Sequence, residues 1–153
     1  ILGSIYAQTV YNIKNPRVSL LNIGEEPEKG NLLAQATYNL MKDNKDFNFV
    51  GNVEGRDILN ENIDVIVCDG FTGNVIIKEA EAFFHIMQKR NHLDDFFKRF
   101  NYEIYGGSPI LGINSNVVVG HGISNGTAIK NMTKLTADIV SAKLAITIKQ
   151  AFV

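Results

Sequence analysis

Residues 63–74, with the sequence IDVIVCDGFTGN, decide the fold that we expect for this chain. The first half, Ile63 to Cys68, is almost entirely apolar, which is typical of a parallel strand covered on both faces. The second half, Asp69 to Asn74, holds two glycines and leads into a segment whose apolar residues follow one helical stripe. A strand that turns tightly into a helix is the repeating step of a parallel α/β sheet.

The segments on either side repeat this step. Periodicity predicts helices at the start of the chain and over 31–42 and 127–150, and strands over 17–23, 47–50 and 117–119. Residues 51–62 are predicted as a polar turn, and residues 89–105 are less regular. Together these segments predict a right-handed parallel α/β sheet in a single domain over residues 1–153.

Composition sets limits on the class of protein. The 153 residues are 45% hydrophobic and 20% charged, as in ordinary globular domains. With 15 basic and 16 acidic side chains the net charge is -1, so no nucleic-acid partner is expected. The single cysteine, Cys68, excludes a disulfide within the chain and favours a reducing, cytoplasmic compartment, and we expect it buried in its strand.

The sequence shows no recognisable membrane-spanning segment or secretory signal. No stretch approaches the roughly 18 apolar residues of a membrane span, and no basic region precedes an apolar signal core. The first residue is not Met, and the sequence begins inside a predicted helix. We therefore expect an excerpt of a longer protein.

Candidate site residues lie in the loops that follow the strands, because ligands of open parallel sheets bind beyond the carboxyl ends of the strands. Lys29, in the loop over 22–31, could hold a phosphate or stabilise a developing thiolate, or it could simply be solvated. In the turn over 69–74, glycine amides near a helix start can bind an anion. Asn74 adds a donor that could polarise a thioester carbonyl; alternatively Thr72 or Asn74 caps the helix.

Two further turns carry candidate groups. His121 lies between two glycines in the turn over 120–126, where it could donate a proton or bind an anion, or be incidental to a tight turn. Arg56 lies between Glu54 and Asp57, where it suits bidentate phosphate recognition or an ion pair. The spacing of Cys68 and the other histidines matches no zinc site, and both common nucleotide-binding fingerprints are missing. We expect no metal and no cofactor.

Several motifs then occur in order along the chain: LLNIGEE with KGN over 20–31, GNVEGRD over 51–57, CDGFTGNV over 68–75, YGGSPILG over 105–112 and GHG over 120–122. This set resembles the PlsX family of phosphate acyltransferases. The family converts acyl-acyl carrier protein and inorganic phosphate into acyl phosphate in bacterial phospholipid synthesis. The resemblance implies a three-layer fold like that of isocitrate and isopropylmalate dehydrogenases and phosphotransacetylases, and a homodimer.

The resemblance also implies roles for single residues. Lys29 and Asn74 align with the family's active-site lysine and asparagine, and His121 lies in the matching Gly-His-Gly turn, so we expect these three to be catalytic. The residues expected to bind phosphate or the acyl group are Glu54, Arg56, Asp69, Gly70, Thr72, Gly73, Gly122 and Ser124.

Family members are about twice as long as this chain, so the resemblance implies the C-terminal half of the enzyme. Residues 83–105 mix aromatic and basic side chains, which suits a peripheral contact with the inner face of the membrane, a dimer contact or core packing. Two other functions stay open. One is a phosphotransacetylase-like enzyme that uses acyl-coenzyme A, and the other is a non-catalytic module that binds carrier protein or membrane.

Overall fold

The computed structural model describes residues 1–152, which divide into two compact units. The first unit is Ile1–Cys68, and the second begins at Asp69 and holds the rest of the described chain. Each unit is described by itself below. That the two form one domain stays a prediction.

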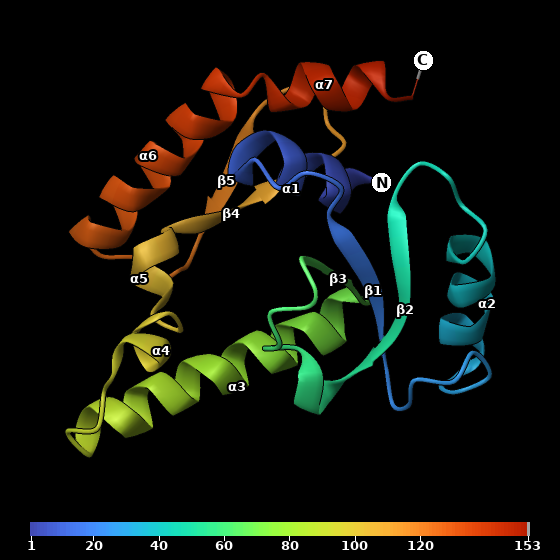
Figure 1. The fold of residues 1–153 in the computed structure, drawn as a ribbon. Helices are drawn as coiled ribbons and strands as arrows, with labels where there is room; N and C mark the ends of the chain where they lie inside the picture. Colours follow the sequence, from blue (N-terminus) through green and yellow to red (C-terminus); the bar gives the residue numbers. More distant parts are fainter. Residues whose placement is uncertain (153) are drawn as a thin grey trace. The chain divides into compact units, whose positions relative to one another are not determined.

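The first unit is built on a three-stranded parallel sheet with the order β2-β1-β3. The strands are β1 (Arg17–Asn22), β2 (Asn48–Glu54) and β3 (Val65–Val67), and the helices are α1 (Leu2–Tyr11) and α2 (Leu32–Met41), with the 3₁₀ turn η1 (Gly55–Asp57) after β2. Figure 1 shows α2 alongside β2. The predicted parallel α/β arrangement is therefore confirmed for these three strands.

Strand β2 is longer than the sequence predicted. The prediction ended the strand at Val50 and placed a turn from Gly51, but β2 continues to Glu54. Val18 pairs with Phe49 and Ser19 with Gly51, so Val50 is an extra residue in a bulge. Gly51 has φ +102°, a conformation that favours glycine. Here a glycine within a strand marks a bulge, and the strand does not end there.

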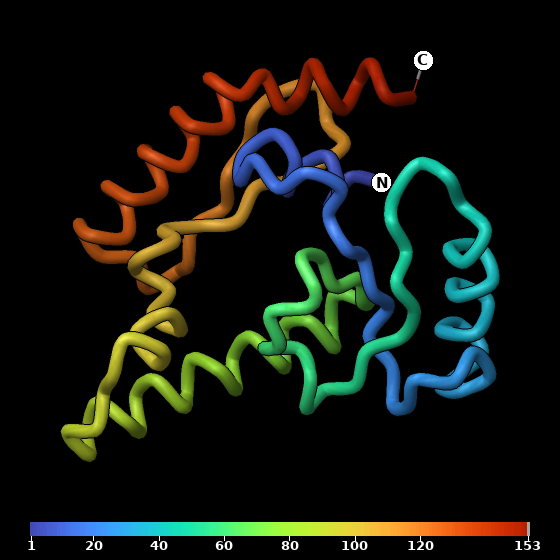
Figure 2. Tube along the Cα trace, viewed as in Figure 1, coloured from blue at the N-terminus to red at the C-terminus, as the bar shows by residue number. Residues whose placement is uncertain are grey.

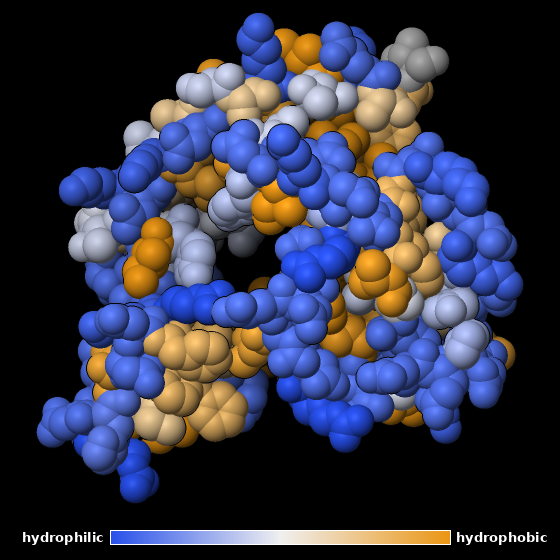
Figure 3. All heavy atoms as spheres, viewed as in Figure 1, coloured by the Kyte–Doolittle hydropathy of each residue, from blue (hydrophilic) through white to orange (hydrophobic). Residues whose placement is uncertain are grey.

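The core of the first unit fixes the orientation of α2. Val18 and Leu20 of β1 and Met41 of α2 are buried together, and the Tyr38 ring lies 5.3 Å from that of Phe49. Helical spacing puts Leu33, Ala36, Leu40 and Met41 on one apolar face, yet Leu33 and Leu40 are 65% and 79% exposed. Only Met41 of that set is in the core. Figure 3 shows hydrophobic side chains among the polar ones at the surface.

The second unit contains a separate, two-stranded sheet of β4 (Gly107–Ile110) and β5 (Val117–Gly120), which pair antiparallel. We predicted β5 as a further parallel strand and did not predict β4, so this part of the fold prediction was wrong. Residues 111–116 connect the two strands, and a link this short can join only antiparallel neighbours. Pro109 hid β4 from sequence reasoning, although proline is tolerated at a sheet edge.

The helices of the second unit are α3 (Gly70–Lys89), α4 (Asp95–Lys98), α5 (Tyr102–Tyr105), α6 (Gly126–Ser141) and α7 (Leu144–Gln150). Figure 2 follows the chain from the end of α3 through the two short helices to β4. The helix predicted over 127–150 is broken, because Lys143 is left-handed with φ 54°. Gly106 meets α6 closely: a Cβ there would lie 2.2 Å from the Met132 nitrogen.

The exposure of Cys68 differs from its prediction. Cys68 is exposed and follows the last residue of β3, so its predicted burial in the strand was wrong. Among the described residues, no helix is both long and apolar enough to cross a membrane.

Candidate active site

Lys29 lies on the loop that follows β1, and the backbone of this loop is fixed by side chains. Asn22 Nδ2 donates to the Lys29 carbonyl at 3.0 Å, and Gln35 Nε2 donates to the Glu28 carbonyl at 2.7 Å. The lysine stem covers Gly24, where a Cβ would lie 2.8 Å from Lys29 Cγ. The side chain of Lys29 is exposed. The loop therefore holds the lysine backbone in place and leaves the ammonium group open to a ligand.

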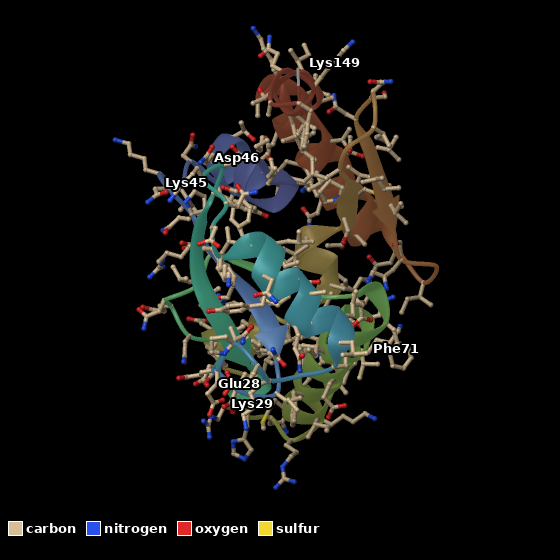
Figure 4. The ribbon with its side chains drawn as sticks, turned by 90° about the vertical axis from the view of Figure 1, so that its right-hand side faces the viewer. Glu28, Lys29, Lys45, Asp46, Phe71 and Lys149 are labelled. Atoms are coloured by element: carbon tan, nitrogen blue, oxygen red, sulfur yellow. The ribbon has the colours of Figure 1, made fainter. Side chains whose placement is uncertain are left out.

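The Lys29 loop lies at the carboxyl edge of the sheet. Figure 4 shows Glu28 and Lys29 at one end of the first unit and Lys45 and Asp46, which precede β2, at the other. The Lys29 loop is tied to β2, because Asn52 Nδ2 donates to the Glu26 carbonyl at 2.9 Å. The structure thus brings this loop to the edge where β2 also ends.

Arg56 follows β2 at this same edge. Its guanidinium lies 3.3 Å from Glu54 Oε2 and 3.4 Å from Asp57 Oδ2, while 75% of its side chain is exposed. The ion-pair alternative is therefore what the structure contains. Exposed pairs of this kind contribute little to stability, so an incoming phosphate could compete for the guanidinium.

The turn after β3 differs from its prediction, because the helix starts earlier. Helix α3 begins at Gly70, and its cap is Asp69, neither Thr72 nor Asn74. The Thr72 amide donates to Asp69 Oδ1 at 2.9 Å, and the Thr72 hydroxyl donates to the other carboxylate oxygen. These two bonds hold the pKa of Asp69 below its usual value. The carboxylate therefore already occupies part of the predicted anion site.

Two amides of this turn consequently have acceptors within the protein. The Thr72 amide bonds the Asp69 side chain, and the Gly73 amide donates to the Asp69 carbonyl at 3.0 Å. The amides of Gly70 and Phe71 come before them, at helix positions that have no carbonyl within the helix to bond, and the Phe71 amide also interacts with the Asp69 carboxylate. Asn74 follows in the first turn of α3 with its side chain exposed.

His121 lies directly after β5, and its side chain is held between two others. Its Nε2 atom is 3.4 Å from Glu81 Oε1 of α3, and its ring centroid is 4.8 Å from that of Tyr102. Ser124 closes the turn, with its Oγ donating to the His121 carbonyl at 2.7 Å. A Cβ on Gly122 would meet nothing within 4 Å. The turn thus orients a single imidazole.

Helix α6 is capped by Asn125, one residue beyond Ser124. The Ala128 amide donates to Asn125 Oδ1 at 3.0 Å, and Asn125 Nδ2 donates to Glu103 Oε1 at 2.7 Å. Ser124 remains a phosphate-binding candidate only by resemblance.

The structure divides the predicted site residues between the two units. Lys29, Glu54 and Arg56 belong to the first unit, and the rest, from Asp69 to Ser124, belong to the second. Within the second unit, Asn74 and Glu81 lie seven residues apart on one face of α3. His121 pairs with α3 about 10 Å along the helix from Asn74.

Sequence reasoning missed Glu81 and Tyr102. The signal for Glu81 was its seven-residue spacing from Asn74, which places both on one helical face.

Over residues 1–152, no group of three or more His, Cys, Asp or Glu side chains could hold a metal ion.

Fold and site together define a class: a parallel α/β protein whose strand ends carry cationic and amide side chains suited to anions. A sequence model described as "Fatty acid synthesis protein" matches residues 1–90, more than half of the chain. The chain belongs to this family. The predicted membership of the phosphate acyltransferase family is confirmed.

Three relatives described here share the name "Phosphate acyltransferase". The chain is 42% identical to "Phosphate acyltransferase" of Dictyoglomus thermophilum, over 94% of this chain and 48% of the relative. It is 44% identical to "Phosphate acyltransferase" of Halothermothrix orenii, over 98% and 51% respectively. For the protein of that name from Syntrophomonas wolfei the identity is 46%, over 90% and 45%. The chain spans about half the length of these curated relatives.

The chain is also shorter than the region that it matches. The match to the Halothermothrix orenii protein runs over 170 residues, against 153 in the whole chain. That relative therefore has at least 17 residues in the matched region that this chain lacks.

Proposed function

We propose that this chain is the C-terminal half of an enzyme that transfers a fatty acyl group from acyl-acyl carrier protein to inorganic phosphate. The observation that carries the proposal is the identity of 42% to 46% with phosphate acyltransferases over at least 90% of the chain. The groups found at the strand ends suit this chemistry, since phosphate is an anion and the carbonyl oxygen becomes negatively charged as the intermediate forms.

In the proposed reaction, a phosphate oxygen attacks the thioester carbonyl carbon and forms the new C–O bond. The carbonyl oxygen becomes an oxyanion in the tetrahedral intermediate, and we assign its stabilisation to Asn74 with the amide of Gly70. Collapse of the intermediate breaks the C–S bond and releases the carrier thiolate. The products are acyl phosphate and free carrier, with no protein nucleophile required.

The attacking phosphate and the departing thiolate are both negatively charged, so each needs a positively charged or hydrogen-bonding partner. We assign Lys29 to phosphate or to the departing thiolate, and Arg56 to phosphate through its bidentate fork. His121 orients phosphate or supplies a proton to the thiolate. Its pairing with Glu81 supports this role, because a carboxylate oxygen 3.4 Å from Nε2 fixes the orientation of the ring.

The other parts of the proposal follow from the resemblance. We propose the three-layer dehydrogenase- and phosphotransacetylase-like fold and a homodimer for the whole enzyme, acting in the cytoplasm. A peripheral membrane contact through residues 83–105 is also proposed. In that segment the rings of Phe96, Phe97 and Phe100 cluster at 5.4 to 6.1 Å, and Arg99 lies over Phe96.

The test is formation of acyl phosphate from acyl-acyl carrier protein and phosphate. It is run with this chain alone and with this chain placed behind the first half of the Halothermothrix orenii relative. We expect activity with the joined protein. Acyl-coenzyme A serves as a parallel substrate, and faster turnover with it would identify the phosphotransacetylase-like alternative.

Folding is checked by circular dichroism in each case. A folded joined protein that binds carrier protein but forms no acyl phosphate would contradict the proposal and favour the non-catalytic module. For the membrane contact, liposome flotation compares the protein with Phe96→Ser/Phe97→Ser; equal flotation would remove that part of the proposal.

A further inference from the structure

The second unit contains a cavity of about 270 Å³ beside His121, and the proposed function assigns no ligand to this space. Helix α3 forms one wall, and the segment from α4 through β4 and the turn after β5 forms the others. Much of the lining is apolar or aromatic, namely Ile77, Ala80, Phe100, Tyr102 and Tyr105. Ligand pockets combine such walls with a few placed polar groups.

The charged groups of the cavity have partners in the protein. Glu81 faces His121 at 3.4 Å, and the imidazole lies against the Tyr102 ring. Arg99, a further lining residue, lies over the Phe96 ring at 5.8 Å. Because these polar groups already contact partners within the protein, the space left between them suits an apolar occupant better than an ion.

Helix geometry connects this cavity to the proposed oxyanion donor. Asn74, Ile77 and Glu81 follow the spacing i, i+3 and i+7, so they share one face of α3. Ile77 lies one turn beyond Asn74, about 4.5 Å along the helix axis. An acyl chain whose carbonyl carbon is held at Asn74 would therefore enter the cavity within its first few carbons.

We propose that this cavity binds the hydrocarbon chain of the acyl thioester, next to the reacting carbonyl, and limits the chain length that the enzyme accepts. The inference rests on the proposed acyl transfer and adds a site for the chain. The cavity lies just under the roughly 300 to 1,000 Å³ of complete ligand pockets, which suits one part of a larger substrate.

Two alanines of α3 provide a matched pair of variants. Ala80 lines the cavity, whereas Ala82 is exposed on the same helix. Ala80→Leu narrows the space, so kcat/KM for a hexadecanoyl carrier should fall about tenfold further than for a hexanoyl carrier, since one methylene in an apolar pocket changes kcat/KM by about 10- to 200-fold. Ala82→Leu should leave the ratio between the two substrates unchanged.

A binding measurement separates this inference from the proposed function. The chain has no tryptophan, so its ultraviolet emission comes from tyrosine, and Tyr102 and Tyr105 line the cavity. Titration with hexadecanoate should change this emission saturably in the unaltered chain and in Ala82→Leu, and much less in Ala80→Leu. Circular dichroism and melting curves verify that both variants fold.

Each outcome decides the inference. Acyl phosphate formation with equal losses for both chain lengths in Ala80→Leu would overturn the acyl-chain site and leave the proposed function intact. Absence of acyl phosphate with every thioester would overturn the proposed function. The hexadecanoate titration would then show by itself whether the cavity binds a hydrocarbon chain. Saturable binding that Ala80→Leu abolishes supports an acyl-chain site, and absence of binding to the unaltered chain rejects it.

Discussion

The Lys29 loop and the His121 turn both follow strands, yet the two regions hold their candidate groups in opposite ways. In the Lys29 loop, Asn22, Gln35 and Asn52 all donate to loop carbonyls, so side chains fix the backbone. In the His121 turn, Glu81 and Tyr102 flank the imidazole, so the functional side chain itself is fixed.

This difference fits the role that we assign to each of the two side chains. A lysine on a fixed backbone can follow a charge as it moves from phosphate to thiolate, because its four-carbon stem stays flexible. A histidine that orients one atom or gives one proton needs a set ring position. The comparison therefore predicts that Lys29 acts by charge and His121 by geometry.

The largest effect on turnover is expected when the Lys29 ammonium group is removed. Lys29→Ala should lower the turnover of acyl-carrier protein in the joined protein by about 100-fold or more, the scale for loss of one placed electrostatic stabiliser. Lys45→Ala is the control, since that exposed lysine lies at the opposite end of the first unit. Turnover of Lys29→Ala within a factor of two of the control would contradict the assignment.

The second prediction concerns the free energy of unfolding of the unit that contains the His121 turn. Gly106→Ala should lower the free energy of unfolding by about 3 kcal/mol, because φ is +76° and the new Cβ would meet the α6 backbone at 2.2 Å. Gly122→Ala, where a Cβ meets nothing within 4 Å, should change it by less than about 1 kcal/mol. Urea unfolding measures both, and similar losses would mean that α6 shifts freely.

A smaller effect is expected in the Lys29 loop. Asn22 is buried, and its side chain bonds both the Lys29 carbonyl and the Ile23 amide. Asn22→Ala should cost about 1 to 2 kcal/mol and loosen the loop. Hydrogen exchange should quicken at Ile23, whose amide loses its acceptor. Unchanged exchange there would show that the loop does not depend on this side chain.

The smallest effect is a dependence of stability on pH in the first unit. Hydrogen bonds from Arg17 to Asp64 hold the pKa of Asp64 below its usual value. The folded state therefore gains stability above the ordinary carboxyl pKa of about 3.9 and loses it as the pH falls through the lowered value. Melting temperatures of the unaltered chain and Arg17→Gln should differ at pH 7 and converge below pH 3; a constant difference would contradict this linkage.

Sequence reasoning predicted the parallel part of the fold because its signals are local. The apolar run before Asp69 and the capped helix after it require only neighbouring residues. The extent of β2 was missed because Gly51 supports either a turn or a bulge, and only pairing with β1 selects the bulge. Likewise, nothing near Lys143 announces the left-handed residue that ends α6.

The candidate site shows the same limit. Asp69 was predicted as a ligand-binding residue, and its capping bonds depend on where α3 starts, which two nearby glycines obscured. The pairing of Glu81 with His121 joins residues forty positions apart and depends on how α3 meets the turn after β5. Periodicity carries no information about such a contact.

Helix α2 has a consequence for handling the protein at the bench. Leu33 and Leu40 lie two turns apart on one side of the helix, and both are largely exposed. A row of hydrocarbon facing water promotes self-association. We expect the isolated chain to grow in apparent size as its concentration rises, so light scattering should accompany every preparation before a weak activity is attributed to chemistry.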